Sequence, residues 1–133
     1  MQGANFELQE DYPLQKETGI IINIGYEVYK QLGSGFLEIV YKDAFEYEFQ
    51  LREIFYQREK EYVVKYKDTI LKHKFYADFV IYDSVILEVK AKLGGLARED
   101  MAQAINYLKV SVCKVGLVLN FTKEKLEVKR VIF

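Results

Sequence analysis

Hydrophobic residues change their spacing along the chain near residue 54, and this change separates two kinds of predicted secondary structure. Before it, apolar residues recur with helical spacing from about Gln15 to Leu32, and the Gly33-Ser34-Gly35 segment ends that run. A second helical stripe extends from about Phe36 to Arg52, with Glu38 at its edge rather than on the far polar face. The first part of the chain is therefore predicted to form two consecutive helices.

After residue 54 apolar and polar residues alternate, which is typical of strands. The predicted strands lie around 62–66 and over about 70–82, 85–91, 115–121 and 125–132, and a helix is predicted over about 98–112. Strict alternation places Ala77 and Phe79 on one face of their strand and Asp78 on the other. The order α-α-β-β-β-α-β-β predicts an α/β fold with a mixed central sheet flanked by helices.

Length and composition predict one domain over residues 1–133, in which residues 1–13 form a loosely held lead-in. Cys113 has no second cysteine to pair with, and together with the single His73 it cannot build a structural zinc site, which takes about four such ligands. No segment resembles a secretory signal or approaches the ~20 apolar residues of a membrane-spanning helix. We therefore expect a cytoplasmic protein with no membrane partner.

The formal net charge is −1, which excludes a histone-like polycation and a protein with a long acidic tail. The two signs are nevertheless unevenly distributed. Residues 1–50 contain three Lys and Arg against nine Asp and Glu, whereas residues 51–133 contain sixteen against eleven. The second segment could therefore present a basic cleft to a phosphate-bearing partner, with modest and salt-sensitive affinity.

The strand Val85–Ala91 carries the most informative side chains. Its aliphatic residues indicate an internal strand, yet Glu88 and Lys90 occupy positions i and i+2 and so share one face. Asp78 lies on the preceding strand, and a short Asp83-Ser84 turn lets Asp78 and Glu88 lie nearly opposite each other. Neighbouring carboxylates repel unless a cation lies between them, and oxygen ligands without His or Cys suit Mg²⁺ or Mn²⁺.

The same charges have a second interpretation. Glu88 and Lys90 could lie on the solvated face of a half-exposed strand, with Lys90 pairing to Asp78 and no ligand involved. The apolar background of the strand and the second carboxylate make the two interpretations about equally strong, so the residues alone leave both open.

The ordered set of motifs resembles a known family. Asp78 followed by Glu88-Val89-Lys90 is similar to the D…(D/E)-x-K signature of the PD-(D/E)XK nuclease superfamily, which has a restriction-endonuclease-like αβββαβ core. Gly35 to Tyr41 matches the G-x-x-E-x-x-Y motif of the GxxExxY proteins, a small bacterial and archaeal branch of that superfamily. The resemblance covers about residues 18–133. Further matching residues are Gln103, Asn106-Tyr107-Leu108, Gly116-Leu117, Asn120-Phe121 and Lys129-Arg130.

The resemblance implies three groups of site residues. The implied catalytic residues are Asp78, Glu88, Lys90 and Gln103, the implied metal ligands are Asp78, Glu88, the Val89 carbonyl and Glu38, and the implied substrate contacts are Tyr107 and Tyr41. Two positions depart from the family pattern. Ala77 replaces the proline of the PD name, and Tyr29 stands where relatives often carry a histidine.

The activity implied by the resemblance is a Mg²⁺- or Mn²⁺-dependent phosphodiesterase that acts on nucleic acid, with DNA favoured over RNA. The alternative is a catalytically silent nucleic-acid-binding or accessory protein that keeps the nuclease fold, because a fold does not guarantee an activity. A third interpretation is a dimeric structural protein whose Tyr-rich edge strands form an interface. A homodimer is compatible with all three.

Overall fold

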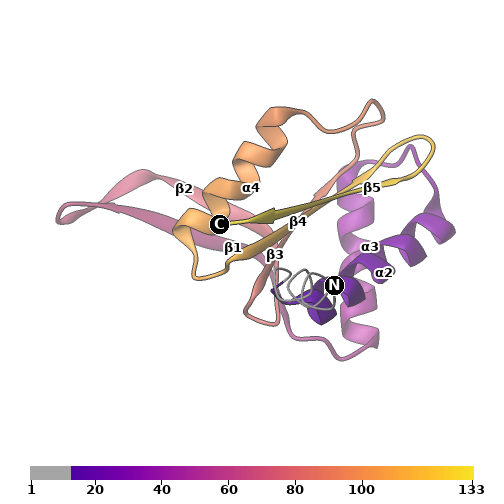
Figure 1. The fold of residues 1–133 in the computed structure, drawn as a ribbon, viewed down its shortest axis with the longest axis horizontal. Helices are drawn as coiled ribbons and strands as arrows, with labels where there is room; N and C mark the ends of the chain where they lie inside the picture. The colour runs from indigo at the N-terminus through magenta and orange to yellow at the C-terminus, as the bar shows by residue number, and fades with distance from the viewer. Residues whose placement is uncertain (1–12) are drawn as a thin grey trace, which may run out of the picture.

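The structure, a computed structural model, describes residues 13–133, so the predicted lead-in lies outside the described residues except for Pro13. Helices and strands follow the predicted order (Figure 1). The elements are α2 (Gln15–Leu32), α3 (Glu38–Leu51), β1 (Tyr56–Tyr66), β2 (Thr69–Ile81), β3 (Val85–Lys90), α4 (Arg98–Val110), β4 (Val115–Phe121) and β5 (Leu126–Ile132). No helix within residues 13–133 is long and apolar enough to cross a membrane.

The strands form one five-stranded sheet in the order β1-β2-β3-β4-β5. Neighbouring strands run antiparallel except β3 and β4, which run parallel. A parallel pair needs a long crossover, and α4 supplies it between β3 and β4 (Figure 1). The predicted α/β class with a mixed sheet is thereby confirmed, and the order is consistent with a restriction-endonuclease-like fold.

Two apolar clusters cover the two faces of the sheet. In the first, Ile24 of α2 and Phe45 of α3 pack with Leu87 of β3. In the second, Leu108 of α4 packs with Ile86 of β3. Because β3 contributes alternate residues to both clusters, it is buried along its length until its half-buried last residue, Lys90. The charged groups at the end of β3 are thus held between two packed layers.

A three-residue turn joins β2 to β3 where the sequence predicts a two-residue turn. It covers residues 82–84, and its first two residues adopt left-handed φ angles of 57° and 54°. The resulting register pairs Phe79 with Leu87. Continued by one step, that register places Asp78 directly opposite Glu88, whereas a two-residue turn would offset them by one residue.

The predicted faces of β2 are wrong at its buried end. Ala77 packs with Val80 in the α4 cluster, whereas Phe79 packs in the cluster beneath α2 and α3. Regular alternation would put Ala77 and Phe79 on the same face. The irregularity falls at Asp78, and across from it on β1 Glu59 has a left-handed φ of 55°. The strand is therefore distorted where it carries a candidate site residue.

Close packing of α2 on the sheet leads to a first prediction. A Cβ built at Gly25 would lie 3.0 Å from one methyl group each of Leu119 and Leu126. We predict that Gly25→Val lowers the free energy of unfolding by about 1–3 kcal/mol, because the added methyl groups overpack this contact. Urea unfolding measures the effect.

The matched control is Gly19→Val in the same helix, where a Cβ would meet nothing within 4 Å. This variant should stay within about 0.5 kcal/mol of the wild type, because valine is no worse than glycine in a helix. Equal losses in the two variants would contradict the close approach of α2 at Gly25.

Candidate active site

At the end away from the turn over residues 82–84, side-chain carboxylates replace backbone carbonyls as the hydrogen-bond acceptors between β2 and β3. Backbone pairing ends at Phe79 and Leu87. Beyond that pair, the Asp78 N–H donates to Glu88 Oε2 over 2.9 Å, and the Val89 N–H donates to Asp78 Oδ2 over 2.8 Å. Each carboxylate satisfies a buried N–H that would otherwise need another acceptor. These two bonds fix the carboxylates of Asp78 and Glu88 beside each other.

Both carboxylates are buried, and the burial has an electrostatic cost. Glu88 is 2 % exposed and Asp78 is 8 % exposed. Burial first, and then the negative charge of Asp78, raise the pKa of Glu88 to about 8, although the Asp78 N–H and the charges of Lys90 and Lys42 oppose the shift. The Glu88 carboxyl is therefore poised to gain a proton or a cation near neutral pH.

Lys42 reaches this site from α3 and was not among the predicted site residues. It is 8 % exposed, and its Nζ lies 3.0 Å from Asp78 Oδ1 and 2.5 Å from Glu59 Oε2. Burial alone would lower the pKa of Lys42, but hydrogen bonds and charges from Glu59 and Asp78 outweigh it and raise that pKa. The only sequence signal is that Lys42 follows Glu38 by four residues, which places both on one helical face.

A row of polar side chains connects β3 to α4 and consists of Lys90, Gln103 and Tyr107. The Lys90 Nζ donates to Gln103 Oε1 over 3.0 Å and lies 4.0 Å from Asp100 Oδ1. The Gln103 Nε2 lies 3.5 Å from the Tyr107 hydroxyl. Burial and the negative charge of Glu88 raise the pKa of Tyr107, so its hydroxyl remains a protonated donor. Helix α4 thus holds the Lys90 ammonium in one direction through the Gln103 amide.

Glu38 lies at the rim of the same group of charges. It is the first residue of α3 and is exposed. Partial burial of its carboxyl and the charge of Asp78 raise the pKa of Glu38, whereas Lys90 and Lys42 act in the opposite direction. This mutual influence places Glu38 in the electrostatic environment of Asp78 and Lys90.

Tyr41, predicted to contact substrate, lies instead in the core. Its side chain is fully buried and stacks on Phe121 with ring centroids 4.0 Å apart. Its hydroxyl donates to the Gly33 carbonyl over 2.7 Å and accepts the Phe36 N–H over 3.3 Å. In this position Tyr41 fixes the loop that leads into α3, and so it positions Glu38 rather than facing solvent.

Asn120 holds the chain just beyond the Glu88-Val89-Lys90 motif. Its Oδ1 accepts the Lys92 N–H over 2.8 Å, and its Nδ2 donates to the Lys92 carbonyl over 3.0 Å. The same Nδ2 donates to Glu127 Oε1 over 3.0 Å, and that oxygen also accepts the Leu96 N–H over 3.0 Å. The loop between β3 and α4 is thereby anchored at both ends, although Asn120 was predicted only as part of a motif without a role.

The donor set at this site fits a hard divalent cation. Within residues 13–133, no three His, Cys, Asp or Glu side chains form a ready-made metal cluster. Asp78 and Glu88 nevertheless offer adjacent carboxylate oxygens, with Glu38 as a third carboxylate at the rim. Burial first, and then the negative charge of Asp78, raise the pKa values of Glu88 and Glu38, so a cation bound beside them would stabilise their charged forms. Carboxylate oxygens are the ligands that Mg²⁺ and Mn²⁺ prefer.

Comparison with protein families agrees with this site. A family model described as the PD-(D/E)XK nuclease superfamily matches residues 15–131. The chain belongs to the PD-(D/E)XK nuclease superfamily. The resemblance deduced from the motifs is confirmed at the level of the superfamily, whose members typically use divalent metals. No curated protein matches the chain.

A solved structure supports the fold independently. The protein described as the crystal structure of SSO0001 superposes with a TM-score of 0.57 at 16 % sequence identity. The match covers 70 % of this chain and 48 % of the other, so this chain spans about half the length of that solved chain. At this identity the likeness concerns the fold alone.

The raised pKa of Glu88 predicts how the metal-free protein responds to pH. A carboxyl whose pKa rises on folding adds stability that is fully present below its ordinary value of 4.5 and is lost as pH rises through about 8. We predict that Glu88→Gln removes this loss, because the amide oxygen can still accept the Asp78 N–H. Between about pH 5 and 8.5 the variant should gain on the order of 4 kcal/mol relative to the wild type.

Urea unfolding in EDTA across this pH range measures the difference. Glu99→Gln, an exposed change in the first turn of α4, is the charge-matched control and should keep the wild-type pH dependence. If the free energy of unfolding of Glu88→Gln and of the wild type changes equally with pH, Glu88 is not protonated in the metal-free fold and the prediction is wrong.

The position of Lys42 leads to a further stability prediction. Lys42→Met keeps the length of the side chain but leaves the buried Asp78 carboxylate without its ammonium partner. We predict a loss of about 2–4 kcal/mol at neutral pH, because removing one member of a buried pair leaves an uncompensated charge. Thermal and urea unfolding in EDTA measure it.

Lys30→Met, an exposed change in the last turn of α2, serves as the control and should stay within about 0.5 kcal/mol of the wild type. If Lys42→Met is as stable as this control, the ammonium does not balance Asp78.

Proposed function

We propose that this protein is a divalent-metal-dependent nuclease that hydrolyses phosphodiester bonds. One observation carries the proposal: the carboxylates of Asp78 and Glu88 lie side by side, held by hydrogen bonds from the Val89 N–H and the Asp78 N–H, and Lys90 follows Glu88 by two residues on β3. A solvated face, the simpler interpretation of these charges, fits poorly with their burial. Buried acidic groups with perturbed pKa values are characteristic of functional sites.

Each residue has a distinct part in this proposal. Asp78 and Glu88 would hold the metal, with the Val89 carbonyl and Glu38 as further ligands. A bound Mg²⁺ or Mn²⁺ would polarise the phosphodiester and lower the pKa of a water molecule. The Lys90 ammonium, directed by Gln103 over 3.0 Å, neutralises negative charge that develops on the phosphate.

Within the superfamily, we propose that the chain is a member of the GxxExxY group. The supporting feature is the packing of the motif Gly35 to Tyr41. Gly35 has a left-handed φ of 100°, which favours glycine, and Tyr41 clamps the preceding loop. The motif therefore places Glu38 at the start of α3, where the charge of Asp78 acts on it.

One observation favours the alternative of a catalytically silent protein. The Lys42 ammonium already supplies a positive charge 3.0 Å from Asp78, which is the place where a metal ion would bind. A protein that keeps this pair permanently would bind nucleic acid without cutting it. The two candidates differ in whether Mn²⁺ raises the melting temperature and whether that rise grows in Lys42→Met.

The remaining expectations from the sequence stay predictions. They are a preference for DNA over RNA, a single domain, a cytoplasmic location and a homodimer.

The nuclease proposal predicts cleavage that depends on both metal and Lys90. With Mg²⁺ or Mn²⁺, the wild type should cut DNA or RNA, single- or double-stranded, and EDTA should stop it. Lys90→Ala and Asp78→Asn should each reduce the rate by about 10²–10³-fold, because each removes charge stabilisation from the reacting phosphate. Gel and fluorescence assays on labelled substrates measure the rates.

Lys30→Ala, which removes an exposed lysine in the last turn of α2, is the control for nonspecific loss of positive charge and should cut at the wild-type rate. Absence of cleavage with every substrate and metal, or cleavage that survives Lys90→Ala, would rule out the nuclease and leave the silent alternative.

A further inference from the structure

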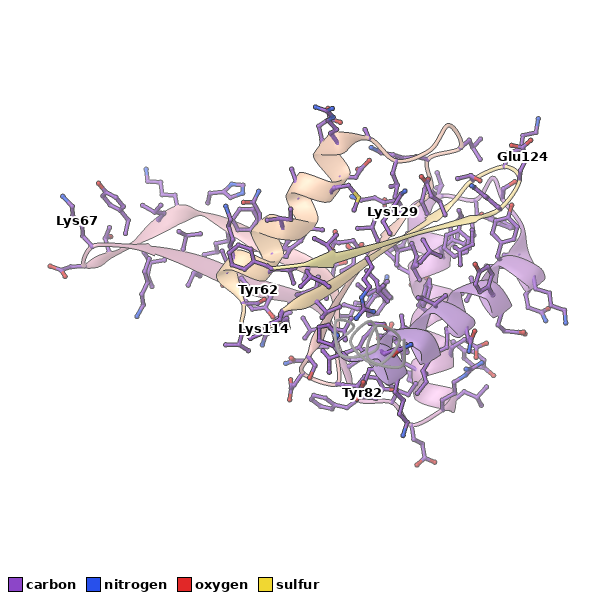
Figure 2. The ribbon with its side chains drawn as sticks, in the orientation of Figure 1. Tyr62, Lys67, Tyr82, Lys114, Glu124 and Lys129 are labelled. Atoms are coloured by element: carbon purple, nitrogen blue, oxygen red, sulfur yellow. The ribbon has the colours of Figure 1, made fainter. Side chains whose placement is uncertain are left out.

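The hairpin formed by β1 and β2 projects beyond the rest of the molecule. We call residues 63–76 the arm. Figures 1 and 2 show it extending from the body along the long axis, with Lys67 at its tip. Every residue from 65 to 74 is exposed, on both faces of the two-stranded ribbon. No helix of the described chain covers this stretch, so its two faces are open to a partner.

The arm exposes several large apolar side chains to solvent. Tyr66, Ile70, Leu71 and Tyr76 are 57 %, 54 %, 40 % and 47 % exposed. A two-stranded hairpin without a packed face is only marginally stable. Apolar side chains on both of its faces therefore indicate a surface that is covered when a partner binds.

The charge of the arm identifies the kind of partner. Residues 63–76 contain four lysines and one aspartate, a formal charge of +3 with His73 neutral, in a chain whose net charge is −1. Ile70 and Lys74 pair with Lys65 and Val63 of β1, and Lys72 lies between them where the register of the two strands shifts. At the tip, the Lys67 ammonium lies over the Tyr66 ring, 5.5 Å from its centroid. A positively charged ribbon fits a polyanion.

We infer that the arm enters the major groove of B-form duplex DNA, with its lysines on the phosphates that line the groove. This inference rests on the proposed nuclease function. The major groove of B-DNA, about 12 Å wide, admits a two-stranded ribbon, and a ribbon in a groove has both faces covered. The major groove of A-form RNA is too narrow for side chains to read, so duplex RNA does not fit the arm.

The arm and the active site share one strand. β2 runs from the arm directly to Asp78, six residues after Lys72, which is roughly 20 Å at the rise of a strand. A duplex held by the arm would therefore meet Asp78 and Glu88 several base pairs from the held groove. In this arrangement the arm sets affinity and position, and cutting occurs at the base of the arm.

A second copy of the chain is a poorer occupant of the same surface. Two arms in contact would place a formal charge of +3 against another of +3, which is repulsive. Lysines on an edge strand such as β1 also oppose edge-to-edge pairing of two sheets. The Lys74 ion pair with Glu61, at 3.4 Å, is exposed and can yield to phosphate.

The test compares two quadruple variants of the full chain. The arm variant carries Lys65→Gln, Lys67→Gln, Lys72→Gln and Lys74→Gln. The control carries Lys16→Gln, Lys30→Gln, Lys123→Gln and Lys125→Gln, four exposed lysines outside the arm with the same total charge change. Circular dichroism and thermal melting first establish that both variants fold as the wild type does.

Binding is measured by fluorescence anisotropy in EDTA, with a 30-base-pair DNA duplex and an RNA duplex of the same sequence. The arm variant should bind the DNA at least about tenfold more weakly, and its salt slope should fall by up to about 3.6, or 0.9 for each lost phosphate contact. The control should bind as the wild type, and the wild type should prefer DNA to RNA. Equal losses in both variants, or equal wild-type affinity for the two duplexes, would overturn the inference.

Two further measurements separate the arm from the nuclease proposal and from self-association. Hydrolysis of bis(p-nitrophenyl) phosphate with Mn²⁺ needs the active site alone, so the arm variant should keep the wild-type rate on it. One outcome is that the wild type hydrolyses neither substrate while the arm variant still binds DNA more weakly than the wild type. In that case the nuclease proposal fails and the inference about the arm stands. The opposite outcome is that sedimentation shows the wild type to be a dimer and the arm variant a monomer, with equal DNA binding by both. The arm is then a contact between copies of the chain and the inference fails.

Discussion

The rest of the site depends on two hydrogen bonds between carboxylates and backbone, where β2 and β3 stop pairing as a regular ladder. The Asp78 carboxylate accepts the Val89 N–H, and the Glu88 carboxylate accepts the Asp78 N–H. Leaving either buried N–H without an acceptor would cost about 1–3 kcal/mol, so the fold itself requires two acceptors at this point. The groups that keep the strands together are therefore the same groups that offer oxygen to a cation, and their positions cannot relax independently.

The charges around this pair come from both layers of the fold. Lys42 approaches from α3 on one face, and Lys90, held by Gln103 of α4, approaches from the other. The two lysines lower the pKa of Glu88 by less than burial and the charge of Asp78 raise it, so that pKa stays well above its ordinary value. Burying an acid in this state costs stability, and folded proteins accept such costs mainly at functional sites.

The sequence predicts the features of this site that depend on local patterns. It predicts poorly the features that depend on tertiary packing. The order of elements, the strand bearing Glu88 and Lys90, and the helix bearing Gln103 all follow from periodicity and short motifs. The length of the turn over residues 82–84 does not, because a three-residue turn and a two-residue turn place the same residue types at almost the same positions. Lys42 was missed because a lysine on a helix is ordinarily exposed, and only the packing of α3 against the sheet buries it.

The negative charge of the site limits where binding energy for nucleic acid can arise. The carboxylate charge of the site, centred on Asp78, would oppose an approaching phosphate until a cation is bound, so the site by itself is a poor source of affinity for a polyanion. Affinity must then come from positive charge located away from these carboxylates yet rigidly connected to them. The proposed arm would meet both conditions, because β2 carries two of its four lysines, Lys72 and Lys74, and Asp78 on one strand. Separating a basic binding element from an acidic site in this way would let a chain with a net charge of −1 bind the phosphate-bearing substrate proposed for it.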